Sequence, residues 1–340
     1  MICVYIFLLL IVLYDIKIYK AKKYNSEFLG IKNATAMKGL AVILVILNHI
    51  SEGMENPGIL TPFRYLGEFA VDIFLFFSGY GLMVSYNSKN DYLQSFWSKR
   101  ILKVLIPFIT ANIVFILMHI INKEFFSTRE IFFYVFGIRL IDSFKWYVIN
   151  IIFLYICFYF SFKYIKSKTL AIIALGTLIM IYNVVCRMEN KGIWWYDANH
   201  CFFIGILVGQ NVNSIYNFIK KNYKIALTTM ILIFLIFFII EIKTEGILLE
   251  IVALGTFNLI LLMLLMKISI ENRLLFFLGR ISYEIYLIHR ITLDLFIGIN
   301  KYEYIILCII ISVILAYIFN IICRFLYNNI YSILDCRYIN

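Results

Sequence analysis

The sequence has little charge and almost no proline. Charged residues occupy 15% of the 340 positions, and only three prolines interrupt the chain. A soluble domain carries about a quarter charged residues. In contrast, 63% of this chain is hydrophobic and its mean hydropathy is +0.90. Because apolar stretches recur throughout and the polar ones are short, we expect a protein of the lipid bilayer without a separate soluble domain.

The sequence also lacks the signatures of several soluble enzymes and metal sites. Its seven cysteines form no CxxC pair, so we expect no disulfide framework and no zinc or other metal site. GxSxG, P-loop, dinucleotide-binding and HExxH patterns are absent. The net charge of +11 would suit a nucleic-acid partner in a soluble protein. Here lysines in cytoplasmic loops explain it, and no nucleic acid is expected.

Apolar runs of membrane-spanning length recur along the chain. A spanning helix needs about 20 mainly apolar residues, so the sequence predicts an all-α, polytopic transmembrane bundle of about eleven helices. The first run is short and contains Asp15. We interpret residues 1–32 as an anchor helix with a cytoplasmic loop, followed by a membrane domain at 33–340. The predicted segments are 2–18, 36–54, 68–86, 103–121, 145–163, 168–186, 198–216, 222–241, 246–267, 281–299 and 303–325.

The loops between these segments alternate in charge. The basic loops are 17–38, 87–103, 163–168, 217–224 and 267–280. The acidic or mixed loops are 53–68, 122–145, 187–197 and 241–246. Because basic loops favour the cytoplasmic side, the pattern predicts a multi-pass protein of the plasma membrane, surrounded by membrane lipids. Its N-terminus is expected outside and its C-terminus in the cytoplasm.

Polar side chains inside apolar helices are functional candidates, because a bilayer solvates them poorly. His49 lies in the apolar run 40–50, eleven residues after Lys38. This spacing puts both on one helix face, about 16 Å apart along the axis, with His49 deep in the outer half. Asp72 is expected at a comparable depth, where a carboxylate could orient the imidazole. The structural alternatives are a histidine bonded between helices and an acid exposed to water.

A second group of candidates is cationic. Lys99, Arg100 and Lys103 cluster at the predicted cytoplasmic start of a helix. Fixed cations at a membrane edge suit a phosphate-rich ligand, and the alternative is a plain topology signal. For Ser78, followed by a glycine, the alternative to a functional role is close helix packing.

The segment 281–299 carries a third group. Ser282, Tyr286 and His289 share one stripe of this predicted helix. A histidine this deep needs polar or aqueous surroundings. Structural hydrogen bonding between helices is the alternative.

Together these fragments resemble the acyltransferase-3 family of integral membrane acyltransferases over roughly residues 33–325. Lysines 38 and 103 stand where that family usually has arginine, which keeps the charge but loses the bidentate fork. The pieces, in family order, are Lys38…Asn48-His49, Val71-Asp72-Ile73-Phe74…Phe77-Ser78-Gly79-Tyr80, Lys99-Arg100…Lys103…Pro107, Lys145-Trp146-Tyr147 and the run from Ile281 to His289.

The resemblance implies substrates and residue roles. The donor would be cytoplasmic acyl-CoA, with acetyl-CoA expected, and O-acetylation would take place on a hydroxyl of a cell-surface polysaccharide or lipid-linked glycan in the cell envelope. His49 would be the general base with Asp72 as its orienter; an acyl-histidine intermediate is the variant. The acyl-CoA-binding residues would be Lys38, Lys99, Arg100 and Lys103, and the supporting residues Ser78, Trp146, Ser282, Tyr286 and His289.

Two other classes of protein remain open at this point. A transporter or flippase of a lipid-linked sugar would also contain buried polar residues along its path, although no inverted repeat is visible in the sequence. A membrane sensor or scaffold would not need the intramembrane polar residues.

Overall fold

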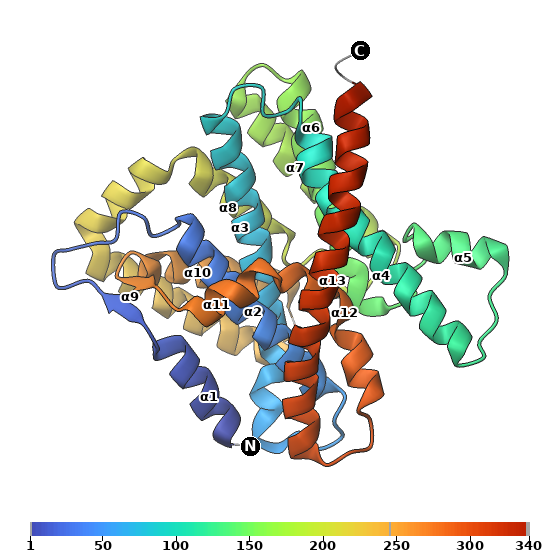
Figure 1. Ribbon diagram of the computed structural model, residues 1–340. Coiled ribbons are helices and arrows are strands. Elements are labelled where there is room, and N and C mark those ends of the chain that lie inside the picture. Colours follow the sequence, from blue (N-terminus) through green and yellow to red (C-terminus); the bar gives the residue numbers. More distant parts are fainter. Residues whose placement is uncertain (1, 245, 338–340) are drawn as a thin grey trace. The chain divides into compact units, whose positions relative to one another are not determined.

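The computed structural model describes residues 2–244 and 246–337, and it is almost entirely helical (Figure 1). Each of the eleven predicted segments contains a helix, which confirms the all-α class. The described part has thirteen α-helices and two short strands. They are α1 Ile2–Leu13, β1 Ile16–Ile18, α2 Ile31–Glu52, α3 Leu66–Ser88, α4 Leu102–Ile121, α5 Thr128–Val135, α6 Trp146–Tyr164, α7 Lys168–Met188, α8 Asn199–Gln210, α9 Val212–Thr244, α10 Ile247–Leu265, β2 Ile268–Ile270, α11 Arg273–Arg280, α12 Ser282–Leu295 and α13 Lys301–Arg337.

Eight helices in the described part are long and apolar enough to cross a membrane. They correspond to eight of the predicted segments. The other three contain shorter helices, with 12 residues in α1, 12 in α8 and 14 in α12. At about 1.5 Å per residue these three measure roughly 18–21 Å, less than the ~30 Å hydrocarbon core of a bilayer. In three of the predicted segments, the helix is therefore shorter than the membrane-spanning length that the apolar run suggests.

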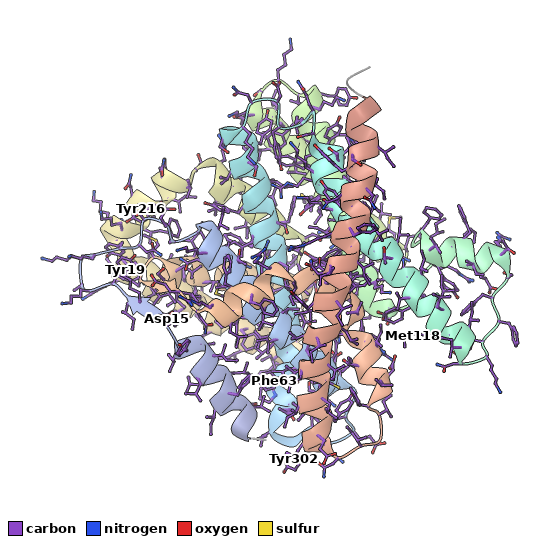
Figure 2. The ribbon with its side chains drawn as sticks, in the orientation of Figure 1. Asp15, Tyr19, Phe63, Met118, Tyr216 and Tyr302 are labelled. Carbon is purple, nitrogen blue, oxygen red and sulfur yellow. The ribbon has the colours of Figure 1, made fainter. Side chains whose placement is uncertain are left out.

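The first segment changes conformation after twelve residues. Asp15 has a left-handed φ of 58° and lies where α1 leads into β1 (Figure 2). Strand β1 then pairs antiparallel with β2, and Lys267 Nζ donates a hydrogen bond to the Lys23 carbonyl oxygen at 2.7 Å. These contacts join loops 17–38 and 267–280, both of which are predicted to be basic and on the same side of the membrane.

Two short helices lie in segments predicted as loops. Helix α5 begins with a capping box, in which the side chains of Ser127 and Glu130 each accept a hydrogen bond from the other residue's backbone N–H. Helix α11 buries Leu275 and Leu278 and packs against α2. Both are only eight residues long, so neither gives the long apolar run that identifies a membrane span.

The described residues form two compact units. Unit 1 contains the described residues up to Asn90 together with Ile172–Ser282, and unit 2 contains Asp91–Ala171 and the described residues from Tyr283 onward. In unit 1, α2, α3, α8, α10 and α11 pack around a common core, and in unit 2 α4 packs with α6 and α13. The separation of residues 1–32 from a domain at 33–340 stays a prediction.

In unit 1, α3 and α8 pack with their backbones in contact (Figure 1). A Cβ atom at Gly79 would lie 2.1 Å from the Phe202 carbonyl oxygen, and one at Gly205 would lie 2.2 Å from the Phe76 carbonyl oxygen. Carbon and oxygen atoms cannot approach so closely, so only glycine fits at either position. Close helix packing, the structural alternative for the Ser78-Gly79 pair, is therefore confirmed for Gly79.

We expect Gly79→Leu to lower the thermal unfolding temperature of the detergent-solubilised protein. The added side chain must push α8 away, and overpacking of this kind costs about 1–3 kcal/mol. Gly81→Ala on the same helix is the matched control, because a Cβ there meets no atom within 4 Å. Equal unfolding temperatures for the Gly79 variant and the wild type would contradict the close contact.

Contacts in unit 1 sort its loops into two groups. Three loops predicted to be outside lead to Glu68, Asp197 and Glu250, whose carboxylate oxygens lie within 4.8 Å of one another. At the other end, the β1–β2 pair joins two basic loops, and the rings of Tyr24 and Tyr223 have centroids 5.4 Å apart. Tyr223 follows a kink at Asn222 within α9, where the sequence predicts the loop 217–224. The same two groups follow from the alternation of charge. That the basic group faces the cytoplasm, with the N-terminus outside and the C-terminus inside, stays a prediction.

Single cysteines at Ser88 and Asn190, placed in a background without reactive native thiols, should report opposite sides of the membrane. Ser88 ends α3 at the basic end and Asn190 lies in a loop at the acidic end, and both are exposed. We expect an impermeant thiol reagent added to intact cells to label Asn190→Cys only, and Ser88→Cys to react after lysis. Labelling of both from outside would overturn the grouping.

Candidate functional site

His49 lies in the last turn of α2, closer to the helix end than the deep position predicted for it. Its Nδ1 atom is 3.0 Å from Oε2 of Glu52, one turn further along the same helix. The His49 side chain is 15% exposed and that of Glu52 is 49% exposed. The pair therefore lies at the end of a membrane-spanning helix, where small polar molecules can reach it.

The Glu52 contact determines which nitrogen of His49 carries a proton. An ionised carboxylate only accepts hydrogen bonds, so the Nδ1 atom facing it must be the donor. Neutral imidazole then has its lone pair on Nε2. A histidine held in this way by a carboxylate has the tautomer that a general base requires.

The segment after α2 holds this end of the helix in place. It is a 3₁₀ turn at Gly58–Tyr65. The Asn48 amide donates hydrogen bonds to Glu52 and to the Phe63 and Arg64 carbonyl oxygens, at 3.0–3.2 Å. Arg64 donates in return to the carbonyl oxygens of Ser51 and Met54. Glu52 is thus fixed on one side by His49 and on the other by Asn48.

Asp72, the predicted orienter of His49, lies elsewhere in unit 1. Its side chain is fully buried, and neither carboxylate oxygen has a regular hydrogen-bond partner among the described residues. Its polar neighbour is the thiol of Cys201 on α8, a weak donor. The acid beside His49 is therefore Glu52 and not Asp72, and the alternative of a water-exposed Asp72 is also wrong.

The predicted cation cluster forms at the start of α4 in unit 2. Lys99 and Arg100 lie in one π-helical turn, Trp97–Ile101, directly before α4. Arg100 Nε donates to the Tyr92 hydroxyl at 2.8 Å, and Lys103 Nζ lies 5.4 Å from the centre of the Tyr327 ring. Single π-turns inside helices are frequent at functional sites, because they present side chains that a regular helix would separate.

Lys38 and Ser78 are not in the same unit as this cluster. Both belong to unit 1, Lys38 on α2 and Ser78 on α3. Lys38 shares its helix with His49, as predicted, and both Lys38 and Ser78 are half-buried. Their predicted roles in acyl-CoA binding and in support of the site stay predictions.

Two residues of the last predicted group, Tyr286 and His289, lie around Phe144 in unit 2. The Tyr286 hydroxyl donates a hydrogen bond to the Phe144 carbonyl oxygen, and the buried His289 ring stacks on the Phe144 ring with centroids 5.8 Å apart. His289 Nδ1 also bonds the Tyr286 carbonyl oxygen at 2.8 Å. Trp146 begins α6 two residues after Phe144. Ser282 belongs to unit 1, where its hydroxyl donates a hydrogen bond to the Gly279 carbonyl oxygen.

Lys145 was not among the predicted site residues. It is fully buried, donates a hydrogen bond from Nζ to Asn112 Oδ1 at 3.1 Å, and lies 3.6 Å from the centre of the Phe115 ring. A buried lysine is rare, and its position next to a predicted helix start made it resemble an ordinary interfacial cation. Here it joins the start of α6 to α4.

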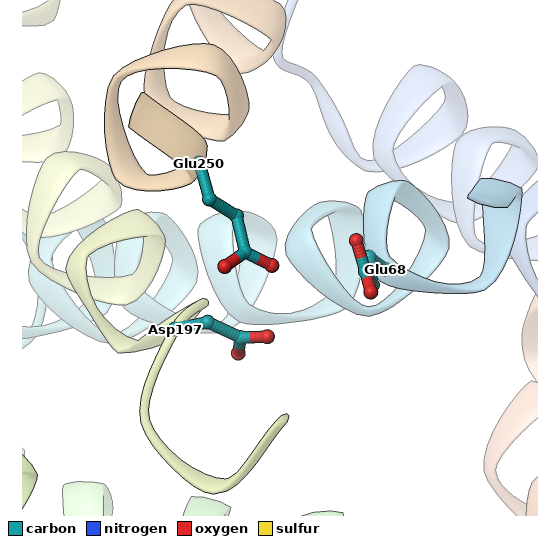
Figure 3. Close-up of side chains that lie close together, drawn as sticks. All are labelled: Glu68, Asp197 and Glu250. Atoms are coloured by element: carbon teal, nitrogen blue, oxygen red, sulfur yellow. The ribbon is translucent and has the colours of Figure 1, made fainter. Parts of the chain in front are cut away.

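Three carboxylates that the predictions also missed meet in unit 1 (Figure 3). The side chains of Glu68 on α3, Asp197 before α8 and Glu250 on α10 point toward one another. Burial and the carboxylates of Glu250 and Glu68 raise the pKa of Asp197 well above its usual range. Glu250 could have been found from the sequence, since it is the one acid inside the apolar run 246–267.

Comparison with known proteins agrees with the resemblance seen in the sequence. The sequence profile of the acyltransferase-3 family, described as an acyltransferase domain, matches residues 31–323. The match runs from the first residue of α2 into α13 and so includes His49 and the cation cluster of unit 2. Neither curated proteins nor solved structures gave a match. A family match over nearly the whole of this helical, apolar chain establishes that it belongs to the acyltransferase-3 family of membrane acyltransferases.

Proposed function

We propose that this protein is a membrane-bound O-acyltransferase of the cell envelope that moves an acyl group, acetyl in the first instance, from acyl-CoA to a hydroxyl of a cell-surface polysaccharide or a lipid-linked glycan. The observation that carries the proposal is the His49–Glu52 pair, with Nδ1 and Oε2 3.0 Å apart. His49 lies within the residues that match the acyltransferase-3 family, and its sequence context resembles the histidine motif of that family.

In the proposed reaction, His49 is the general base. Its Nε2 lone pair takes the proton of the acceptor hydroxyl while the hydroxyl oxygen attacks the thioester carbonyl carbon. The new C–O ester bond forms, the C–S bond breaks, and the proton passes from the imidazolium to the departing CoA thiolate. Glu52 stabilises the imidazolium during this step through its contact with Nδ1.

The acyl-histidine route is the variant of this mechanism. In that route Nε2 attacks the thioester first, and the acceptor hydroxyl then takes the acyl group from the histidine. The Nδ1–Glu52 contact would support either route, because both use a neutral Nε2 and a histidine ring held in one orientation.

The cation cluster of unit 2 is the proposed donor site. Acyl-CoA carries several phosphate groups, and arginine and lysine side chains are the usual phosphate ligands. Lys99 and Lys103 are exposed, and Arg100 is half-buried against the Tyr92 hydroxyl, which limits its conformations. Charges fixed in this way lose less conformational freedom on binding than mobile surface lysines.

We expect His49→Gln to reduce acyl transfer from labelled acetyl-CoA by about 10²–10⁴-fold, the usual contribution of a positioned general base. Glutamine keeps a similar size and can still bond to Glu52, but it cannot take a proton. Glu52→Gln should reduce transfer as well, because an amide can bond Nδ1 without stabilising the imidazolium charge.

Glu55→Gln is the matched control for both variants. Glu55 lies three residues beyond Glu52 and is exposed, so its change should leave transfer near the wild-type rate. Acetyl-CoA affinity measured in parallel separates a chemical defect from a binding defect. Near-wild-type turnover by His49→Gln would contradict the role of His49 and make His289 the next candidate.

Arg100→Ala should weaken CoA binding by about tenfold or more, since a charge-assisted hydrogen bond contributes roughly 1.5–3 kcal/mol. The binding that remains should weaken further as salt is added, through screening. Arg129→Ala, on α5 of the same unit, removes an arginine away from the cluster and should bind CoA as the wild type does. If both variants bind CoA alike, the cluster is only a topology signal.

A further inference from the structure

The carboxylates of unit 1 form a set of oxygen ligands drawn from three separate elements. The carboxylate oxygens of Glu68, Asp197 and Glu250 lie within 4.8 Å of one another (Figure 3). Asp197 and Glu250 are only 2% and 7% exposed, whereas Glu68 is exposed. The cluster is therefore walled by the protein on one side and accessible from the side of Glu68.

A fourth carboxylate lies behind this cluster. Asp72 is one turn after Glu68 on the same face of α3, and its exposure is 0%. Neither of its oxygens has a regular hydrogen-bond partner in the described part of the chain. It is close enough to Asp197 and Glu250 to interact electrostatically with both. When ionised, a buried carboxylate in this state is destabilising unless a positive charge compensates it.

Among the described side chains, no cation forms an ion pair with these four acids. Their neutral donors include the Ala198 backbone N–H, which bonds Asp197 Oδ1, and the Cys201 thiol beside Asp72. Glu250 and Asp197 also share a side-chain hydrogen bond. When these four acids are ionised, no cation from a described side chain pairs with them, and a bound cation would supply the missing charge.

Hard divalent cations fit this site best, because every ligand atom is a carboxylate oxygen. Calcium–oxygen distances of about 2.3–2.6 Å allow two ligands of one ion to lie up to about 5 Å apart. For magnesium, with distances of about 2.0–2.1 Å, the limit is about 4.2 Å. The oxygens lie within 4.8 Å of one another, which one calcium ion can span. Calcium also accepts irregular geometry, whereas magnesium demands a near-ideal octahedron and keeps several waters, so we expect a preference for calcium.

We infer that unit 1 contains a divalent-cation site, preferring calcium, formed by Glu68, Asp197 and Glu250 with Asp72 behind them. Cysteine and histidine spacing does not indicate this site, because all of its ligands are carboxylates, and it departs from the expectation of no metal site. The bound ion would tie the starts of α3 and α10 to the loop before α8. Gly67, next to Glu68, packs so closely on the Asn48 side chain that a Cβ there would lie 2.5 Å from it, so the ion would also brace the helix end next to His49. The inference does not depend on acyl transfer, since binding of the ion is measured directly.

The test uses the purified full-length protein in detergent after treatment with a chelator. Calcium chloride should raise its thermal unfolding temperature in a saturable manner, because a ligand that binds only the folded state stabilises it. Half-saturation is expected at about 10⁻⁴–10⁻³ M, the range of extracellular calcium modules. Radioactive calcium in equilibrium dialysis should give one site per chain, and magnesium should compete weakly.

Asp197→Asn and Glu250→Gln should each lower calcium affinity by about tenfold or more, since charged ligands set the affinity of such sites. Glu68→Gln, at the exposed ligand, is the second variant if the buried substitutions fail to fold. The matched control is Asp294→Asn, an exposed acid paired with Arg290 in unit 2, which should keep wild-type affinity. The inference would be overturned if the wild-type protein bound no calcium at 10⁻² M, about tenfold above the expected range. It would also be overturned if the wild type and Asp197→Asn bound calcium with the same affinity.

Discussion

The backbone contact between α3 and α8 is the interaction on which the arrangement of unit 1 depends. Gly79 and Gly205 let the two helices approach until a Cβ at either position would collide with the opposite chain. The contact also fixes their register, so Asp72 meets Cys201 and Glu68 meets Asp197. With helices held further apart by larger side chains, these acids would not share one site. A packing constraint between small residues thus determines where the charged residues converge.

The two proposed functional regions are built in different ways. The His49–Glu52 pair is local, because residues three apart on a helix face each other, and its tertiary support comes from Asn48 and Arg64 beneath it. In unit 2 the cation cluster depends on residues distant in sequence, with Tyr327 of α13 beside Lys103 of α4. In both regions the polar groups lie at helix ends, where they avoid the interior of the bilayer.

Much of the helical framework could be predicted from the sequence because a run of about 20 apolar residues is a strong signal. Helices shorter than the bilayer, such as α8 and α12, could not be separated from full spans, since their neighbours are equally apolar. The placement of Lys38 and His49 on one helix could be predicted from their spacing in the sequence. Glu52 was within reach of the same reasoning, because it follows His49 by one turn. Cys201, the polar neighbour of Asp72, could not be predicted in this way, because their contact depends on the register of α3 against α8.

The account's central claim is that this chain transfers acyl groups rather than transporting sugars, and purified wild-type protein in lipid nanodiscs tests it most directly. Acetyl-labelled acetyl-CoA would be supplied together with glycans and lipid-linked glycans extracted from the producing cell's envelope. The account predicts release of free CoA thiol that increases with added acceptor, and label that appears on the glycan fraction as a base-labile ester. Absence of acetyl-CoA turnover, together with movement of labelled lipid-linked sugar across liposomes containing the protein, would contradict it.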